Sequence, residues 1–447
     1  MLFFAHLAIV AVYAVLPVLA IVVASREAWR TRRALPLTSL MLTFGAGFAI
    51  GLAICLVYAV GTRGRLMMGQ VVLAGYFGTG LLLLLKGFDW LIRATLARLT
   101  GLHDQPRSDG PDIAVTEGNA PAAEPPTVVP LPPRLWVRAA FAGVARAAIL
   151  FAIGLPYVMA SVLTYRPKVA PIDDPQSQLG YEYQRVTFEA TDDGTPLVGW
   201  WIPAQRQRRN APRDPMWGKR TVIACHGLAA NKSNQLILAR AYPPEGFNVL
   251  IFDFRAHGES GGQLTTLGDR ERRDVLGAVR WVRANHADEA EKVYGVGASL
   301  GAAALIAAAA DNSDEGRAID AVAVYGTYDN LGALTRSIAQ SYFFPPLRQL
   351  LIHVGLPLAS VQTGSDMAHF APAELAPRIW PRPLMIVHGR RDEIIRFDHG
   401  EALYDAAAQP KYNLWLKDGT HNDVIDNESA AKLVLEFFRT AEPVPVI

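Results

Sequence analysis

Cysteine is almost absent from the sequence, which has only Cys55 and Cys225 among its 447 residues. No disulfide is expected, because Cys55 lies in an apolar run and Cys225 in a predicted buried strand. The cysteines therefore do not indicate whether the protein works in an oxidising or a reducing compartment. A strong net charge is lacking too, since 43 Lys and Arg against 41 Asp and Glu leave a formal charge of +2. The sequence also has no zinc-finger spacing and no Lys/Arg-rich face. These absences exclude a strongly basic nucleic-acid binder.

Charged residues are scarce mainly in the first part of the chain. Residues 1–165 hold 13 Lys/Arg and 7 Asp/Glu, whereas residues 166–447 hold 30 and 34. The whole chain is 51% hydrophobic with a mean hydropathy of +0.17, which is too apolar for an ordinary soluble enzyme. We therefore expect a lipid-embedded part followed by a globular part.

Four apolar runs are long enough to cross a bilayer core as helices of roughly 20 residues. They cover residues 2–24, 37–60, 66–85 and 147–164. The first run is not read as a cleaved signal, because its arginine cluster follows it instead of preceding it. No carboxylate partner lies at membrane depth, so the spans are predicted to anchor the chain without forming a proton or ion relay. The predicted organisation is three spans in residues 1–100, a flexible linker at 101–136 with many prolines, and a fourth span at 137–165.

The basic residues near the span ends predict the orientation of the chain, because Lys and Arg are retained on the cytoplasmic side. With the N-terminus outside, nine of them lie on the inner side and four on the outer side. This multi-pass topology places everything after the fourth span on the extracytoplasmic side.

The pattern after residue 166 changes to short apolar runs separated by longer amphipathic or alanine-rich ones, which is typical of an α/β sheet. Eight strands are predicted, at residues 183–190, 195–204, 221–225, 248–254, 292–298, 319–325, 383–387 and 412–416. The first two flank Asp192-Asp193-Gly194 and are expected to form an antiparallel hairpin. Most of the others are separated by enough chain for a crossover helix, so the sheet should be mainly parallel.

One short motif in this part points to nucleophilic catalysis. Gly297-Ala298-Ser299-Leu300-Gly301 follows a predicted strand and opens an alanine-rich helix. A serine on such a turn has its hydroxyl exposed above the sheet, and the glycines at 297 and 301 let the backbone pass closely. The pattern alone is weak, since it arises by chance in about one chain in ten of this composition. Its position between a strand and a helix strengthens it.

A serine nucleophile needs a base and a carboxylate that orients the base, in the chain order Ser, Asp, His for such a sheet. Asp392 and His421 each lie just beyond a predicted strand, at the sheet edge where Ser299 also emerges. The rival acids are Asp418 and Asp423, and the rival base is His399; none combines a strand end with the right order. Ser299, Asp392 and His421 are therefore the predicted triad.

An oxyanion in the acyl-transfer intermediate needs two amide donors. We predict that one is the backbone N–H of Leu300, directly after the nucleophile. The other is expected from the loop His226-Gly227-Leu228, with Leu228 as first choice. Gly227 would allow close approach, and His226 is predicted to order this loop.

Five ordered motifs resemble those of the α/β-hydrolase superfamily. They are Cys225-His226-Gly227, the stretch from Phe252 to Gly261, the Ser299 turn, the stretch from His388 to Asp392, and the stretch from Gly419 to Asp423. They are most similar to the serine-aminopeptidase-like and monoacylglycerol-lipase-like branches. The resemblance covers about residues 184–438, within an α/β-hydrolase domain predicted over residues 166–447, and it implies hydrolysis of an ester, thioester or amide without a cofactor or metal.

An insertion at about residues 327–381 precedes the strand that carries the acid, where members of this fold have a cap. Phe343, Leu347, Leu350, Leu351 and Val354 recur there at helical spacing. This predicts a cap helix packed on the sheet domain, with a lipid-touching lid as the alternative. An apolar pocket wall favours a hydrophobic acyl substrate or a lipid.

Two other functions remain open from the sequence alone. The same triad would serve a serine peptidase, for which Glu259 is the only acid that position suggests as a partner for a substrate amine. A non-catalytic membrane sensor or scaffold with a hydrolase fold is the alternative from another class.

Overall fold

The computed structural model describes residues 155–165, 168–207, 213–342, 348–349, 351–425 and 427–440. The chain divides into two compact units, Met1–Val158 and Met159–Ile447, and the second holds nearly all of the described residues. Three of the predicted spans lie outside the described residues, as do residues 147–154 of the fourth. Among the described helices, none has the length and apolar character needed to cross a bilayer.

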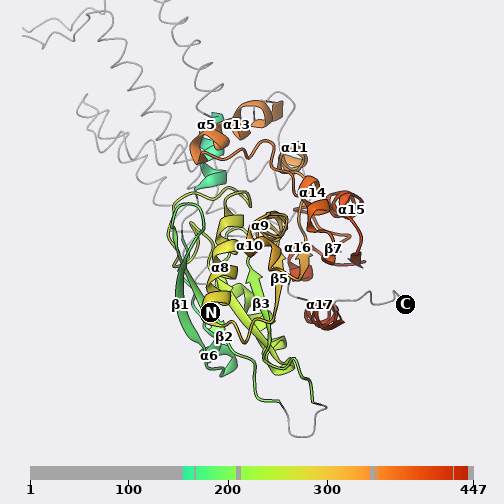
Figure 1. The fold of residues 1–447 in the computed structure, drawn as a ribbon. Coiled ribbons are helices and arrows are strands. Elements are labelled where there is room, and N and C mark those ends of the chain that lie inside the picture. The colour runs from blue at the N-terminus through green and yellow to red at the C-terminus, as the bar shows by residue number, and fades with distance from the viewer. Residues whose placement is uncertain are drawn as a thin grey trace, which may run out of the picture. The chain divides into compact units, whose positions relative to one another are not determined.

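An eight-stranded sheet organises the second unit, with the order β1-β2-β4-β3-β5-β6-β7-β8 (Figure 1). The β1–β2 and β2–β4 pairs are antiparallel, and every other neighbouring pair is parallel. The strands are β1 Gln184–Glu189, β2 Pro196–Ile202, β3 Arg220–Cys225, β4 Phe247–Phe252, β5 Lys292–Ala298, β6 Ala321–Tyr325, β7 Leu384–Gly389 and β8 Lys411–Leu416. All eight predicted strands are confirmed, including the hairpin, with bounds that differ by a few residues.

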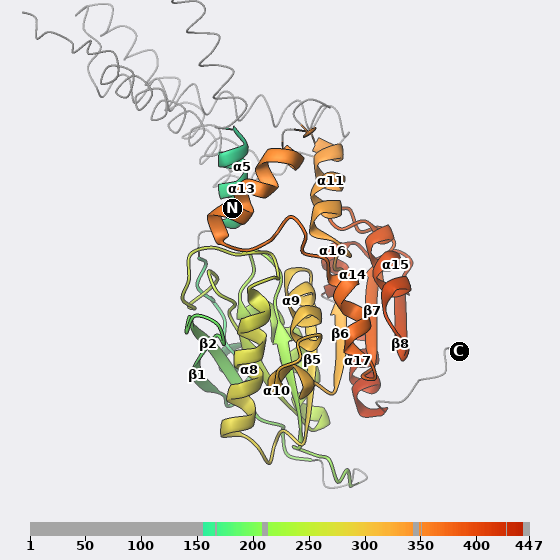
Figure 2. The same ribbon diagram turned by 45° about the horizontal axis from the view of Figure 1, so that its top comes forward.

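Helices cover both faces of the sheet. They are α5 Leu155–Thr164, α6 Pro175–Leu179, η2 Lys232–Gln235, α7 Leu236–Ala241, η3 Pro243–Glu245, α8 Glu271–Asn285, α9 Leu300–Ala309, α10 Asp314–Arg317, α11 Leu331–Tyr342, the π-helical turn η4 Leu351–Gly355, α13 Leu356–Thr363, α14 Pro372–Leu375, η5 Ala376–Ile379, α15 Phe397–Ala406, α16 His421–Ile425 and α17 Glu428–Thr440. In Figure 2, α8 and α9 lie over the face of the sheet turned toward the viewer.

The side chains of each strand point alternately to the two faces of the sheet, which divides the core into two layers. On β3, Ile223 and Cys225 join the cluster beneath α8 and α9, whereas Val222 and Ala224 join the cluster beneath α7 and α17. Both faces are buried because successive side chains of a strand point to opposite sides. Cys225 is a free, buried cysteine within the first layer.

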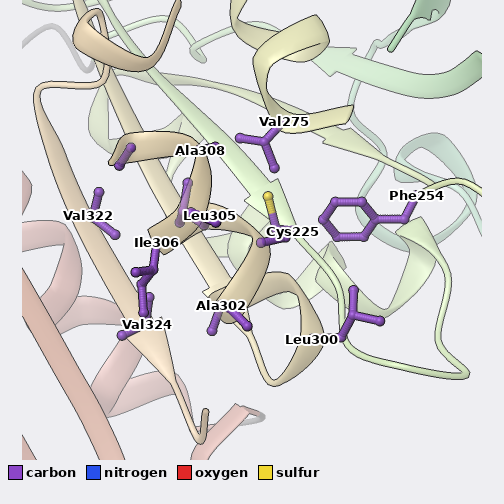
Figure 3. Close-up of a cluster of buried hydrophobic side chains, with 14 of the residues drawn as sticks. Cys225, Phe254, Val275, Leu300, Ala302, Leu305, Ile306, Ala308, Val322 and Val324 are labelled. Atoms are coloured by element: carbon purple, nitrogen blue, oxygen red, sulfur yellow. The ribbon is translucent and has the colours of Figure 1, made fainter. Parts of the chain in front are cut away.

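The central helix α9 is apolar all round and buried along its whole length. Leu300, Ala302, Leu305 and Ile306 face neighbouring apolar side chains of the sheet and of α8 (Figure 3). A helix without a polar face is stable only inside a core. The alanine-rich stretch that follows Ser299 therefore fixes the start of α9 rigidly against the sheet.

The chain between β6 and β7 contains α11, η4 and α13, and it meets α5. Gln362 of α13 donates to the Ser161 hydroxyl of α5 at 2.9 Å, and the Thr164 hydroxyl lies 3.3 Å from Gln362 Oε1. Figure 2 shows α5 and α13 side by side. Of the apolar residues predicted to define a cap helix, Phe343, Leu347 and Leu350 lie outside the described residues.

Candidate active site

Ser299 occupies a strained turn at the junction of β5 and α9. Its backbone has φ of 52° and ψ of −114°, in the left-handed region that a residue with a side chain rarely adopts. Its N–H donates to Tyr325 O at 2.8 Å, and its carbonyl accepts from Ala302 and Ala303 at the start of α9. The turn is held from both sides, which keeps the Ser299 side chain at the carboxyl edge of the sheet.

The two glycines of the motif are required by close packing. A Cβ at Gly297 would lie 2.6 Å from Gly301 O, and a Cβ at Gly301 would lie 2.5 Å from both Cys225 O and His226 O. Gly227 differs, because a Cβ there would meet Ser299 Cβ at 3.5 Å, an ordinary contact. The close approach expected at Gly227 is therefore not a steric requirement, whereas Gly297 and Gly301 are fixed by backbone contacts.

Asp392 and His421 form a hydrogen-bonded pair. His421 Nδ1 lies 2.7 Å from Asp392 Oδ2, and the carboxylate is fully buried. The other carboxylate oxygen accepts the N–H groups of Ile394 and Ile395 at 2.9 and 2.8 Å. Because Nδ1 donates to the carboxylate, Nε2 is left as the basic ring nitrogen.

Gly326, which the sequence did not single out, and His388, the first residue of the motif that contains Asp392, shape this pair. Gly326 has φ of +49°, and a Cβ there would lie 3.3 Å from His421 Nδ1 and 3.4 Å from Asp392 Oδ2. His388 Nε2 donates to Ile395 O at 2.9 Å and lies 3.5 Å from Asp392 Oδ2. Burial lowers the pKa of His388, which keeps this ring neutral beside the carboxylate.

The rival residues have other partners. Asp418 forms an exposed ion pair with Arg391 at 2.8 Å, and Asp423 accepts from the Thr420 hydroxyl at 2.7 Å. His399 Nδ1 lies 2.5 Å from Asp329 Oδ1. Neither acid contacts His421 through a hydrogen bond in the described structure, and His399 is not among the described residues that line the cavity of Ser299.

The predicted oxyanion-hole residues lie on either side of Ser299. Leu300 is the first residue of α9, where a backbone N–H has no acceptor within the helix. Leu228 follows β3 and lines the same cavity as Ser299 and Leu300. This arrangement can offer two amides to a developing negative charge.

His226 orders the loop that carries Leu228. Its Nε2 accepts the Phe254 N–H at 3.1 Å, so the proton is on Nδ1, which lies 2.7 Å from Gly227 O. Burial, with a smaller contribution from neighbouring His257, lowers the pKa of His226 to about 4. A neutral ring with both nitrogens engaged is suited to positioning and not to proton transfer.

A buried ion cluster supports the next part of this loop. Lys232 is fully buried, with Nζ 2.6 Å from Asp253 Oδ2 and 2.5 Å from Glu259 Oε2. Asp253 also accepts the backbone N–H groups of Lys232 and Glu259. Glu259 pairs in addition with Arg185 at 3.2 Å, and these partners lower its pKa. The cluster fixes η2, whose Asn234 and Gln235 line the cavity described next.

Ser299 and His421 line one cavity of about 680 Å³. Most of the other described side chains that line it are apolar: Leu163, Leu228, Leu267, Leu300, Tyr328, Leu334, Ile338, Ile394 and Ile395. Leu267 has φ of 60° and is held in place because the Tyr328 hydroxyl donates to its carbonyl. Among the described residues, no group of three or more His, Cys, Asp or Glu could hold a metal ion.

Several of these lining residues were not predicted from the sequence. Leu163 lies in the segment interpreted as the fourth span, and Ile338 and Leu334 lie in the insertion, where other positions were chosen. Leu267 carries no sequence signal, since its conformation depends on the hydrogen bonds of the buried Glu271 carboxylate to Thr266 and Gly268. Gly326 lies beside His421 and Asp392 and is not among the described lining residues; as a glycine directly after β6, it carries a turn signal that the sequence did offer.

Residues 220–342 match the family model described as the alpha/beta hydrolase fold. This stretch contains β3 to β6, the Ser299 turn and α9. The second unit has the α/β-hydrolase fold. The α/β-hydrolase part of the predicted fold class, with its eight-stranded and mostly parallel sheet, is thereby confirmed, whereas the preceding four-helix transmembrane region stays a prediction.

Some of the known proteins similar to this domain have names that give an activity, and others do not. The protein YfhR of Escherichia coli K12, named as uncharacterized, is 28% identical over 244 residues, which cover 55% of this chain and 75% of YfhR. The lysophosphatidylserine lipase ABHD12 of Danio rerio is 24% identical over 255 residues, covering 55% of this chain and 64% of that protein. The Pyrococcus furiosus esterase Pf2001 aligns with a TM-score of 0.48 and 24% identity, covering 62% of this chain and 98% of the esterase.

Proposed function

We propose that the hydrolase domain belongs to a membrane-anchored serine hydrolase that cleaves an ester or thioester of a hydrophobic acyl substrate. One observation carries the proposal. Ser299, on a strained turn, and His421, bonded to the buried Asp392, line the same mostly apolar cavity. A similar protein from Danio rerio is named as a lysophosphatidylserine lipase, and this name is consistent with a lipid ester as the substrate.

In the proposed mechanism, Ser299 Oγ attacks the acyl carbonyl while His421 Nε2 takes its proton. The backbone N–H groups of Leu228 and Leu300 stabilise the oxyanion. His421 then protonates the leaving group, and an acyl-enzyme remains on Ser299. Water, activated by His421, releases the acid. Asp392 holds the imidazole in the productive tautomer throughout.

The peptidase alternative has weaker support at this site. An aminopeptidase substrate carries a positively charged amine, yet no Asp or Glu is among the described residues that line the cavity. Glu259, the acid that position suggested, is engaged by Lys232 and Arg185. An amine in this cavity would therefore lose hydration without gaining a carboxylate partner.

The substrate class can be tested with a series of p-nitrophenyl esters. Each methylene buried in an apolar pocket contributes about 0.8 kcal/mol, so we expect kcat/KM to rise from acetate toward longer acyl chains until the pocket is full. The measurement is the initial rate with purified full-length protein in detergent, with aminoacyl-anilides assayed in parallel. Cleavage of the anilides, combined with no chain-length trend among the esters, would overturn the acyl-hydrolase preference.

The membrane anchor and its sidedness are also part of this proposal. They rest on the four apolar runs and on the nine basic residues assigned to the inner side against four on the outer side. The hydrolase domain is accordingly placed on the extracytoplasmic side.

Single cysteines test this topology in a chain whose Cys55 and Cys225 are replaced by alanine. A cysteine at Ala122, in the predicted linker, should be shielded from a membrane-impermeant thiol reagent in intact cells, or in spheroplasts where an outer membrane exists. A cysteine at Asn210 should react. Both should react after detergent lysis, which serves as the control. The reverse pattern in intact cells would place the hydrolase domain in the cytoplasm.

A further inference from the structure

A second cavity, of about 130 Å³, lies beside the cavity that holds Ser299. Four elements surround it: α5, α11, η4 and α13. Its described lining residues are Ala160, Leu163, Thr335, Ile338, Ala339, Leu351, Gly355 and Leu356. Two of them, Leu163 and Ile338, also line the larger cavity, so the two spaces share these side chains as a common wall.

The lining of the second cavity excludes polar ligands. Thr335 is the one described lining residue with a polar side-chain atom, and its hydroxyl already donates to Leu331 O at 2.8 Å. None of the described lining residues is charged. A polar or charged group entering this space would lose its hydrogen bonds to water without replacement, whereas an alkyl chain would gain contacts.

The shared wall is held in a defined position. The carbonyl of Thr164, next to Leu163, accepts the Thr265 N–H at 2.8 Å, and Gln362 of α13 binds Ser161 on the same helix. Ala160 and Thr164 are buried, with exposed fractions of 2% and 0%. The last turns of α5 are thus packed into the hydrolase domain and carry Leu163 to the boundary between the cavities.

We propose that the second cavity receives the far end of a long, unbranched acyl chain whose carbonyl lies at Ser299. In this arrangement Leu163 and Ile338 are specificity-determining residues, because their side chains border both cavities along the path of the chain. The inference rests on the proposed acyl-hydrolase function and specifies its substrate as a long-chain acyl ester or thioester.

The test fills or enlarges the second cavity without altering the triad. Ala339 lines the second cavity only, so Ala339→Leu should shorten the usable acyl chain, and Leu351→Ala should lengthen it. Ala333→Leu on the same helix is the matched control, since Ala333 is not among the described lining residues of either cavity. The readout is the ratio of kcat/KM for p-nitrophenyl tetradecanoate to that for the hexanoate. We expect a fall of at least about tenfold in Ala339→Leu, a rise in Leu351→Ala and the wild-type ratio in Ala333→Leu.

A binding experiment tests the proposed acyl-chain site independently of ester hydrolysis. In full-length Ser299→Ala protein, the affinity for hexanoic, decanoic and tetradecanoic acids, measured by calorimetry, should rise by about fourfold per methylene. The rise should stop at a shorter chain when Ala339→Leu is added. The inference is wrong and the proposed function stands if esters are hydrolysed but two results hold. The kcat/KM ratio is unchanged in Ala339→Leu and Leu351→Ala, and the affinities for the acids are unchanged by Ala339→Leu. If the acids bind as expected but no ester is cleaved, the proposed function is wrong and the acyl site stands.

Discussion

Replacing Ser299 with alanine should lower kcat for a p-nitrophenyl ester by about 10⁶, because removing the nucleophile of a serine triad leaves only substrate binding and the oxyanion hole. KM should change little, since the hydroxyl contributes little to holding the acyl chain in an apolar cavity. The measurement is steady-state hydrolysis by purified protein. The melting temperature should stay close to that of the wild type.

Ser337→Ala on α11 is the matched control for this loss. Ser337 precedes the lining residue Ile338 on α11 but is not among the described lining residues of either cavity. Its rate should equal that of the wild type. A folded Ser299→Ala protein that kept a substantial fraction of the wild-type rate would remove Ser299 from the nucleophile role.

The next largest effect is expected for Asp392→Asn, with a fall in kcat on the order of 10⁴. Asp392 Oδ2 accepts the Nδ1 proton of His421, while Oδ1 accepts from Ile394 and Ile395. An amide oxygen would remain with those two backbone groups and turn its NH₂ group toward Nδ1. The imidazole would then favour the wrong tautomer, and the imidazolium would lose its carboxylate. The measurement is kcat across a pH range.

Asp418→Asn is the control for the acid. It removes the exposed ion pair with Arg391, and such pairs contribute little to stability. Activity should therefore be close to that of the wild type. Loss of activity in folded Asp418→Asn together with retained activity in Asp392→Asn would move the role of the acid to Asp418.

The strands were predictable because their residues form short apolar runs flanked by turn residues. The turn Asp192-Asp193-Gly194 also signalled the hairpin directly, and Asp193 Oδ1 accepts from the Thr195 N–H and hydroxyl there. Strand order was not predictable in the same way. The placement of β4 between β2 and β3 depends on long-range pairing, such as that of Trp200 with Ile251, for which a single sequence carries no local signal.

The three candidate triad residues could be located from the sequence because each follows a strand in a parallel sheet, where the carboxyl ends meet at one edge. The cavity walls could not. Leu163 lies at the end of an apolar run that was interpreted as a membrane span, and hydropathy does not distinguish a lipid contact from a cavity wall. The strained Leu267 depends on Glu271, a buried carboxylate whose importance is visible only after folding.

The end of the predicted fourth span, in α5, lines the candidate active site. The last turns of this helix pack into the hydrolase domain and supply Leu163, so the same apolar segment that is predicted to lie in the bilayer also lines the site.

The central claim, that Ser299 is the activated nucleophile, is tested most directly by labelling with an active-site fluorophosphonate. The full-length wild-type protein should become covalently modified at Ser299, as mapped by mass spectrometry of its peptides. Ser299→Ala should not label, and His421→Ala should label far more slowly, because the base is missing. A folded wild-type protein that failed to react would contradict the account and favour a non-catalytic membrane sensor or scaffold with a hydrolase fold.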